Sequence, residues 1–441
     1  MPSPHRAILS AAAPLFLSLS AGVVAQLIST SLLGHQATTQ LAAFALASAV
    51  LAPVTAAVSG GLRGMAPFIA ACRDRPAEAL PILKDARWLT IGLGTLGACV
   101  MLGVPLIARM NGAPREVTAE FGILPLLLAL QVLLSSAGSG ANGMLIALGR
   151  SRQVLRSSLS STATGVVLHL TLVPRIGIQG TGIALLASTA LGVTVSNVFL
   201  LRVPELAGQS LWPGRPRPRE IVRMAKVGIP MSATLVIKFT VMGGVTYAAA
   251  RTGVQGAAAH AILTSLEGFL GLAAFAVAQA VTPEIARAAS PEDARRLNRA
   301  AVTIAATGVL TGALVLLLLG DTVLGLFTSD ATVLALALAL LPLLGAYALA
   351  NNCGIVMSWS LMGLKRSTWT LGSAIAGNGM LALTMIPAAA AWGLTGLWTA
   401  LTAGGVLILG LQTTGFRRHS ARAGSALRRS PAALSSGDRD A

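Results

Sequence analysis

Gly177-Ile178-Gln179-Gly180 recurs in the second half of the chain as Gly393-Leu394-Thr395-Gly396. Further pairs recur at almost the same separation: Pro14 with Pro230, Ala42-Ala43-Phe44-Ala45 with Ala258-Ala259-His260-Ala261, Leu124-Pro125-Leu126-Leu127 with Leu341-Pro342-Leu343-Leu344, and Leu148-Gly149-Arg150 with Leu364-Lys365-Arg366. Such a duplication in an apolar chain indicates two related helical bundles that handle a substrate between them. The duplication therefore favours a transporter over a membrane enzyme.

The composition excludes a soluble globular protein, because 54% of the residues are hydrophobic and only 11% are charged. Apolar stretches of about 20 residues are long enough to cross a hydrocarbon layer of about 30 Å as helices. The sequence contains twelve, near residues 8–33, 38–61, 88–108, 118–147, 153–173, 177–201, 222–250, 255–281, 297–320, 331–362, 367–387 and 393–415. We therefore predict an all-α polytopic membrane protein with twelve transmembrane helices, arranged as two six-helix repeats around a central cavity.

Four segments follow from this pattern. We expect an N-lobe over residues 1–205, a cytoplasmic linker over 206–221, a C-lobe over 222–416 and a disordered basic cytoplasmic tail over 417–441. The linker is rich in Pro and Arg, which predicts a stiff, solvated connection. The tail lacks apolar periodicity, which is typical of disorder.

The net charge of +17 reflects membrane topology and does not indicate nucleic-acid binding. Twenty-seven of the 32 Lys and Arg residues fall in the terminal segments and connections on one side of the predicted spans. The positive-inside rule places that side, with both termini, in the cytoplasm. We expect a monomer in the bacterial inner membrane whose basic face contacts anionic lipid.

Few motifs carry recognisable chemistry. The three cysteines have no metal-ligand spacing, no nucleotide-binding loop is present, and acids do not cluster as a metal-dependent transferase would need. We therefore predict a protein that is not an enzyme and needs no cofactor or metal. Pro14 and Pro230 lie early in the first helix of each repeat, where a proline bends a helix, so we expect hinges there.

Two ionisable residues are expected deep in the membrane on neighbouring spans. Lys238 precedes the turn at Thr252 by almost the same distance in sequence as Glu267 follows it, so the two share nearly one depth. Facing each other, they would form an ion pair that offsets part of the cost of burial. The pair is interpreted either as a coupling switch, broken when Glu267 is protonated, or as a static contact that fixes helix register.

Other polar residues in the spans are further candidates. His169 titrates near neutral pH and suits proton exchange, although a backbone hydrogen bond would also explain it; His260 is expected to be structural. The remaining polar residues are expected to line the cavity or to bond between helices, with Phe239 and Met242 beside the predicted ion pair. The polar residues are Gln26, Ser29, Thr30, Asn351, Asn352 and Asn378.

The order of these motifs over residues 8–415 resembles the MATE family of multidrug and toxic-compound extrusion transporters. The resemblance rests on the prolines of the first span of each repeat, Leu-Leu-Gly34-His35 at the end of span one, and the Gly-x-x-Gly openings of spans six and twelve. The basic turns after spans four and ten also match. The resemblance implies two lobes and efflux of amphipathic, often cationic compounds, driven by entry of protons or sodium ions.

The carboxylates that many members of that family carry are replaced in this sequence. The matching positions hold Ser29, Gly165, His169, Lys238 and the Asn351-Asn352 pair. Without those oxygen ligands sodium coupling is disfavoured, and proton coupling needs another titratable group. We therefore predict proton-coupled antiport of small organic compounds by alternating access. The alternative within the same superfamily is a flippase for a lipid-linked precursor.

Overall fold

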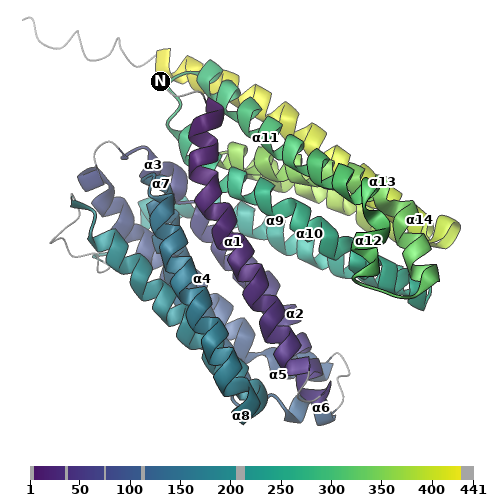
Figure 1. Ribbon diagram of the computed structural model, residues 1–441. Coiled ribbons are helices and arrows are strands. Elements are labelled where there is room, and N and C mark those ends of the chain that lie inside the picture. Colours follow the sequence, from purple (N-terminus) through teal and green to yellow (C-terminus); the bar gives the residue numbers. More distant parts are fainter. Residues whose placement is uncertain (1–3, 35–37, 74–75, 111–114, 205–213, 429–441) are drawn as a thin grey trace, which may run out of the picture. The chain divides into compact units, whose positions relative to one another are not determined.

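The computed structural model describes residues 4–34, 38–73, 76–110, 115–204 and 214–428, and these form helices joined by turns (Figure 1). The helices are α1 (Pro4–Gly34), α2 (Thr38–Arg63), α3 (Ala66–Ala70), the 3₁₀ turn η1 (Pro76–Ala79), α4 (Leu80–Leu102), α5 (Val104–Met110), α6 (Arg115–Ala119), α7 (Leu124–Ala147), α8 (Ser151–Leu201), α9 (Pro218–Ala250), α10 (Val254–Ala286), α11 (Pro291–Leu318), α12 (Gly320–Gly325), α13 (Ala331–Gly363) and α14 (Ser367–Arg428).

The described helices account for the twelve expected spans. Nine are long and apolar enough to cross a membrane, and α4 with α5, bent by 47° between them, makes a tenth. Two of the nine, α8 and α14, each join two helices across a kink. Large apolar side chains lie exposed along them, as the hydrocarbon layer requires; Leu96, Leu318 and Leu383 are more than 60% exposed.

The two kinks show that the sequence duplication is also a structural one. Ile176 and Gly177 have φ/ψ of −131°/16° and 57°/−135°, and Trp392 and Gly393 have −131°/19° and 57°/−142°. The second residue of each kink has the positive φ that only glycine adopts without strain. The Gly-x-x-Gly motifs therefore reverse the chain between the last two helices of each repeat.

The two helix segments that meet at each kink pack through contacts at equivalent positions in the two repeats. The small residue of each contact lies on one segment in the first repeat and on the other segment in the second. Gly165 faces Ser188 within α8, and at the equivalent positions of the second repeat Leu381 faces Gly404 within α14. A second such contact joins Ser161 to Gly192 in α8, and Gly377 to Ile408 in α14. One small partner per contact suffices for close helix approach, so each repeat reaches the same packing with a different assignment of glycine.

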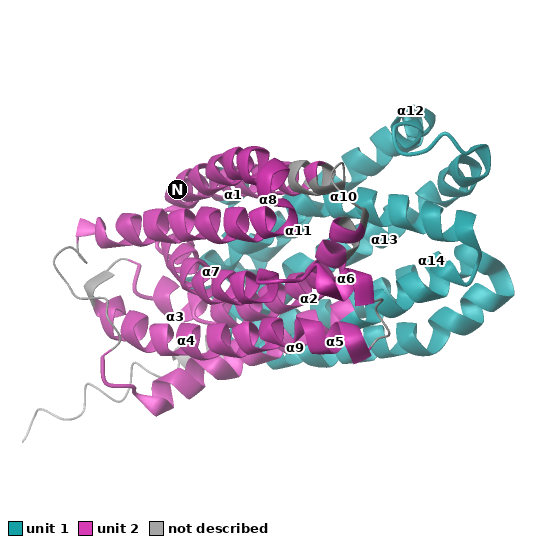
Figure 2. Ribbon diagram, turned by 90° about the horizontal axis from the view of Figure 1, so that it is seen from below, with its two compact units in different colours: residues 1–10, 240–441 teal, residues 11–239 magenta. Residues whose placement is uncertain are grey.

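The chain divides into two compact units, residues 11–239 and residues 1–10 with 240–441 (Figure 2). We call these the 11–239 unit and the 240–441 unit. The boundary lies inside α9, not in the linker, because the first half of α9 packs on α2. Ser232 Oγ donates to the Ala57 carbonyl at 2.6 Å, and Gly228 lies against the Gly61 backbone. The division into lobes expected from the sequence remains a separate prediction.

Some helix ends differ from expectation. α14 continues to Arg428, past residue 417 where the tail was expected to begin; residues 429–441 lie outside the described part. Tertiary contacts hold this extension: Ser420 is fully buried and accepts a hydrogen bond from Arg295 Nε at 3.1 Å. His419 packs edge-on to Trp369, with 5.5 Å between ring centroids.

Candidate functional site

The clearest polar contact within the spans of the 240–441 unit joins Glu267 on α10 to Asn351 on α13. Asn351 Nδ2 donates to Glu267 Oε1 at 2.7 Å. Glu267 is half-buried in a largely apolar helix, and the Asn351 amide gives its carboxylate a polar partner there. An ionised acceptor makes this bond stronger than a neutral one, and protonation of Glu267 weakens it. The contact thus gives the protonation state of Glu267 a structural consequence.

Asn352 lies beside this pair and is fully buried. Its Nδ2 donates to the Ala348 carbonyl at 2.9 Å, while Oδ1 has no hydrogen-bond partner among the described residues. A Cβ atom at Gly271, one helical turn beyond Glu267, would lie 3.1 Å from Asn352 Oδ1. Glycine at that position lets α13 present two adjacent amides to α10. Asn351 thus bonds to the neighbouring helix and Asn352 to its own, and the role of both in lining the cavity stays a prediction.

An aromatic cluster of the same unit lies on these helices and on α14. Trp398 on α14 packs edge-on to His260 of α10 and to Tyr347 of α13, each with 5.8 Å between ring centroids. Tyr347 is four residues before Asn351, so the two share one face of α13. The cluster is part of the hydrophobic core of the unit, with Leu263 and Leu344 fully buried nearby.

Lys238 and Phe239 end the 11–239 unit, whereas Met242 and Glu267 belong to the 240–441 unit. Met242 packs on the hydrophobic core of its unit, and Phe239 is 41% exposed. Lys238 and Glu267 thus belong to different units, and the ion pair between them stays a prediction.

His169 of α8 is buried in the 11–239 unit, with only 3% of its surface exposed. Its Nδ1 lies 2.7 Å from the Gly165 carbonyl oxygen. A carbonyl only accepts, so Nδ1 carries a proton, and in the neutral ring Nε2 is left with its lone pair. Nε2 has no hydrogen-bond partner among the described residues. The backbone bond expected of a structural histidine is present, and it leaves one nitrogen able to accept a proton.

The structure places the remaining predicted residues on three helices, α1, α9 and α14. Asn378 is buried and donates to the Ala374 carbonyl of its own helix at 2.9 Å. Gln26 is exposed on α1. Ser29 and Thr30 also lie on α1, and their side chains are outside the described part. Pro14 and Pro230 are buried inside α1 and α9, and their role as hinges stays a prediction.

Sequence reasoning missed the ion pair of Asp85 with Arg217. Arg217 Nη2 and Nε lie 2.6 and 2.8 Å from Asp85 Oδ2, and Trp88 Nε1 donates to the Gly214 carbonyl at 3.0 Å. The hydrogen bond to Asp85 raises the pKa of the Arg217 guanidinium above its ordinary value. α4 begins at Leu80, earlier than expected, which brings the 2%-exposed Asp85 into the helix. The described end of the linker is thus fixed to α4.

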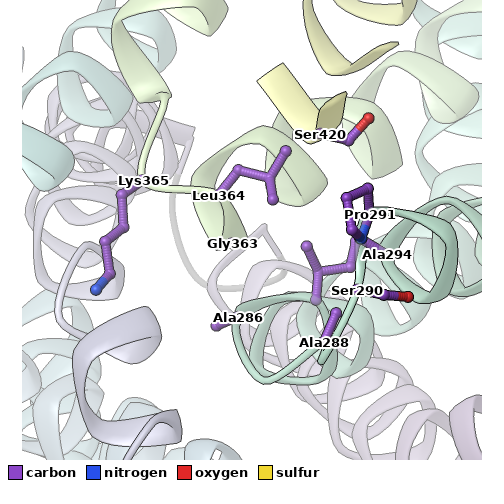
Figure 3. A pocket seen from close by; sticks show the side chains of 10 residues that line it. Ala286, Ala288, Ser290, Pro291, Ala294, Gly363, Leu364, Lys365 and Ser420 are labelled. Atoms are coloured by element: carbon purple, nitrogen blue, oxygen red, sulfur yellow. The ribbon is translucent and has the colours of Figure 1, made fainter. Parts of the chain in front are cut away.

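A cavity of about 210 Å³ lies at the other end of the 240–441 unit from the start of α10 (Figure 3). It lies between the end of α10, the start of α11, the turn after α13 and Ser420 of α14. Ser290, which caps α11, and Lys365 contribute polar groups to its wall. Glu267 and Asn351 do not line it, so it is separate from the polar contact of α10 and α13. Among the described residues no group of three or more His, Cys, Asp or Glu could hold a metal ion.

The chain is similar to known proteins both in sequence and in fold. The MatE family model matches residues 230–387. A probable multidrug resistance protein NorM of Aromatoleum aromaticum is 27% identical over 366 residues, covering 78% of each chain, and one of Xanthomonas campestris is 26% identical over 418 residues, covering 88% of each. The solved MATE transporter VcmN of Vibrio cholerae, in its bent form, superposes with a TM-score of 0.82 at 16% identity, over 95% of this chain and 97% of that one.

The chain thus matches the MATE family in part of its sequence and in its fold. A transporter of the MOP superfamily from Pyrococcus furiosus has the same fold, with a TM-score of 0.83 at 19% identity over 97% of both chains. The resemblance to the MATE family in sequence placed carboxylates where this chain has Lys238 and Asn351. In this chain the acid that contacts Asn351 is Glu267, from the neighbouring helix α10.

Proposed function

We propose that the protein exports small amphipathic, often cationic, organic compounds across the bacterial inner membrane by proton-coupled antiport. The match to the MATE family supports transport, and the relatives named as multidrug resistance proteins support organic compounds as the substrates. The observation that carries the coupling proposal is the hydrogen bond of Asn351 to Glu267, a carboxylate in the middle of α10. An ionisable residue at that depth is costly and is a functional candidate.

In this proposal Glu267 is ionised in the resting protein. Protonation removes its charge, weakens the bond to Asn351 and breaks the predicted ion pair with Lys238. A cationic substrate that binds near Glu267 competes with the proton for the same carboxylate. Mutually exclusive occupancy by proton and substrate is what couples their opposite movements in an antiporter, since each ligand stabilises a different state.

His169 is the second proton-binding candidate, in the other unit. Its protonated Nδ1 is held by Gly165, so a second proton binds at Nε2 and converts the ring to a cation. We propose that Glu267 is the main coupling residue and that His169 contributes to the dependence of transport on pH. The basic face of the molecule contacts anionic lipid, and both termini lie in the cytoplasm.

Transport by variants of one helix tests the proposal. Efflux of a fluorescent organic cation is measured in cells with and without a proton uncoupler, for the wild type, Glu267→Gln and Lys238→Ala. The matched control is Glu284→Gln, which removes a carboxylate from the end of the same helix, where Glu284 lies 3.9 Å from Arg287. We expect uncoupler-sensitive efflux that Glu267→Gln abolishes, that Lys238→Ala lowers and that Glu284→Gln leaves intact.

The opposite results are equally informative. Uncoupler-sensitive efflux by a well-folded Glu267→Gln variant would contradict the role of Glu267 and move the coupling to His169. Absence of efflux from folded wild type for a panel of organic cations would contradict the substrate class and favour a lipid-linked cargo. Retained expression and a normal elution profile in detergent establish that each variant is folded.

A further inference from the structure

His260 is a buried histidine that lacks the partners a buried histidine normally has. Only 2% of its surface is exposed, and neither Nδ1 nor Nε2 has a hydrogen-bond partner among the described residues. The indole nitrogen of Trp398, whose ring packs edge-on to the imidazole, is likewise without a partner there and fully buried. Buried polar atoms without hydrogen bonds cost stability, so a polar ring at this position needs a reason.

The internal repeat shows that packing alone is not that reason. The equivalent position in the first repeat is Phe44, which is also buried, with 4% of its surface exposed. An apolar ring therefore fills this place in the first repeat without polar atoms to satisfy. The second repeat has an imidazole at the same place. It also has Glu267 further along the same helix, where the first repeat has Leu51.

The surroundings of His260 connect it to Glu267. The two residues are seven positions apart on α10, so they share one face of the helix at a separation of about 10 Å along its axis. Tyr347 packs on the same Trp398 ring as His260 and lies on the face of α13 that presents Asn351 to Glu267. His260, Tyr347 and Glu267 therefore follow each other along one interface of α10 and α13.

Other titratable and charged groups lie on the elements around His260. The titratable residues on the elements packed here include Glu267 and Glu284 on the same helix, Tyr347 and Cys353 on α13, and Tyr247, which is 64% exposed, on α9. Helices α9, α11 and α12 contribute apolar residues such as Val245, Leu316 and Leu324 to the core. Arg251 and Asp321, at the same end of the unit, are exposed.

We infer that His260 takes up the proton from the side of the membrane at which α10 begins and passes it on to Glu267, along the interface of α10 and α13 that Tyr347 shares. The inference rests on the proposed role of Glu267. A proton binds the free nitrogen of the neutral imidazole and forms the imidazolium. The imidazolium then releases that proton and the Glu267 carboxylate binds it, which leaves neutral imidazole and neutral carboxyl.

The test compares pH profiles of transport in proteoliposomes with an imposed proton gradient. His260→Phe places the ring of Phe44 at this position. The control is His419→Phe, because His419 also packs edge-on to a tryptophan, Trp369, in the same unit. We expect His260→Phe to lose about tenfold in rate at pH 7.5 on the proton-entry side and to recover at a pH about one unit lower, since Glu267 must then be protonated directly from water.

A purely structural role for His260 would change the amount of folded protein but not the position of the pH profile. Wild-type profiles in His260→Phe, together with loss of transport in Glu267→Gln, would overturn the inference and leave the proposed function standing. Proton-driven transport by Glu267→Gln would instead remove the proposed function. Should His260→Phe fail to accumulate, His260→Asn keeps a polar side chain that does not titrate near neutral pH, and the same acid shift is expected of it.

Discussion

At the scale of single residues, the turn after α13 differs from the related turn after α7 in a way that can be measured. Lys365 has a φ of 59°, and its counterpart Gly149 has 76°. The left-handed conformation costs about 1–2 kcal/mol for a residue with a Cβ atom. The second repeat therefore tolerates a strain that the first avoids, and in the first a Cβ atom would also overlap the Arg73 guanidinium.

We predict that Gly149→Ala lowers the free energy of unfolding by about 1–2 kcal/mol, whereas Lys365→Gly changes it by less than about 1 kcal/mol. In Lys365→Gly the relief of strain is offset by the greater freedom of glycine in the unfolded chain. Thermal unfolding in one detergent measures both. A Gly149→Ala variant as stable as the wild type would show that the turn adjusts without strain.

At the scale of elements, the first half of α9 is held to α2 by contact of backbone with backbone. A methyl group at Gly228 would overlap the Gly61 carbonyl, and one at Gly64 would overlap the backbone of Gly228. Ser232 Oγ, 2.6 Å from the Ala57 carbonyl oxygen, adds a hydrogen bond one turn further along. Close approach through small residues gives strong packing between helices in a membrane.

We predict that Gly228→Ala destabilises the 11–239 unit by about 1–3 kcal/mol, the usual cost of an added group at a tight contact. The matched control on the same helix is Gly243→Ala, since a Cβ atom there meets nothing within 4 Å. The thermal midpoint should fall in the first variant and stay or rise in the second. Equal midpoints for both would mean that α2 and α9 separate without cost.

At the scale of the whole molecule, the distribution of charge predicts how the chain crosses the membrane. Arg219, at the start of α9, belongs to the basic side, and Val254, at the start of α10, belongs to the opposite side. In a variant whose cysteines Cys72, Cys99 and Cys353 are replaced by alanine, single cysteines at these two exposed positions report orientation. We expect a membrane-impermeant maleimide added to intact cells to label Val254→Cys and to spare Arg219→Cys.

Permeabilised cells provide the control, because both positions should then react. Labelling of Arg219→Cys in intact cells would reverse the proposed topology and with it the side from which a proton reaches His260. The same experiment leaves the fold untouched, since orientation depends on charge asymmetry between the two membrane faces and not on helix packing.

Much of this protein was determined by local features of the sequence. The number of spans follows from apolar length, because a helix must satisfy its own backbone in lipid. The kinks at Gly177 and Gly393 follow from glycine, which alone adopts their backbone angles without strain. The register of the repeat follows from motifs that recur at a nearly constant separation. Each of these depends on residues close together in the chain or on its repetition.

Only the tertiary structure decided which polar side chains meet. Depth along the helices made Lys238 and Glu267 neighbours in principle, but the partner that α13 brings to Glu267 is Asn351. The pairing of Asp85 with Arg217 and the unpartnered nitrogens of His260 were likewise invisible in the sequence. A hydrogen bond depends on the rotation of two helices about their axes, which is set by the packing of many side chains at once and not by any short motif.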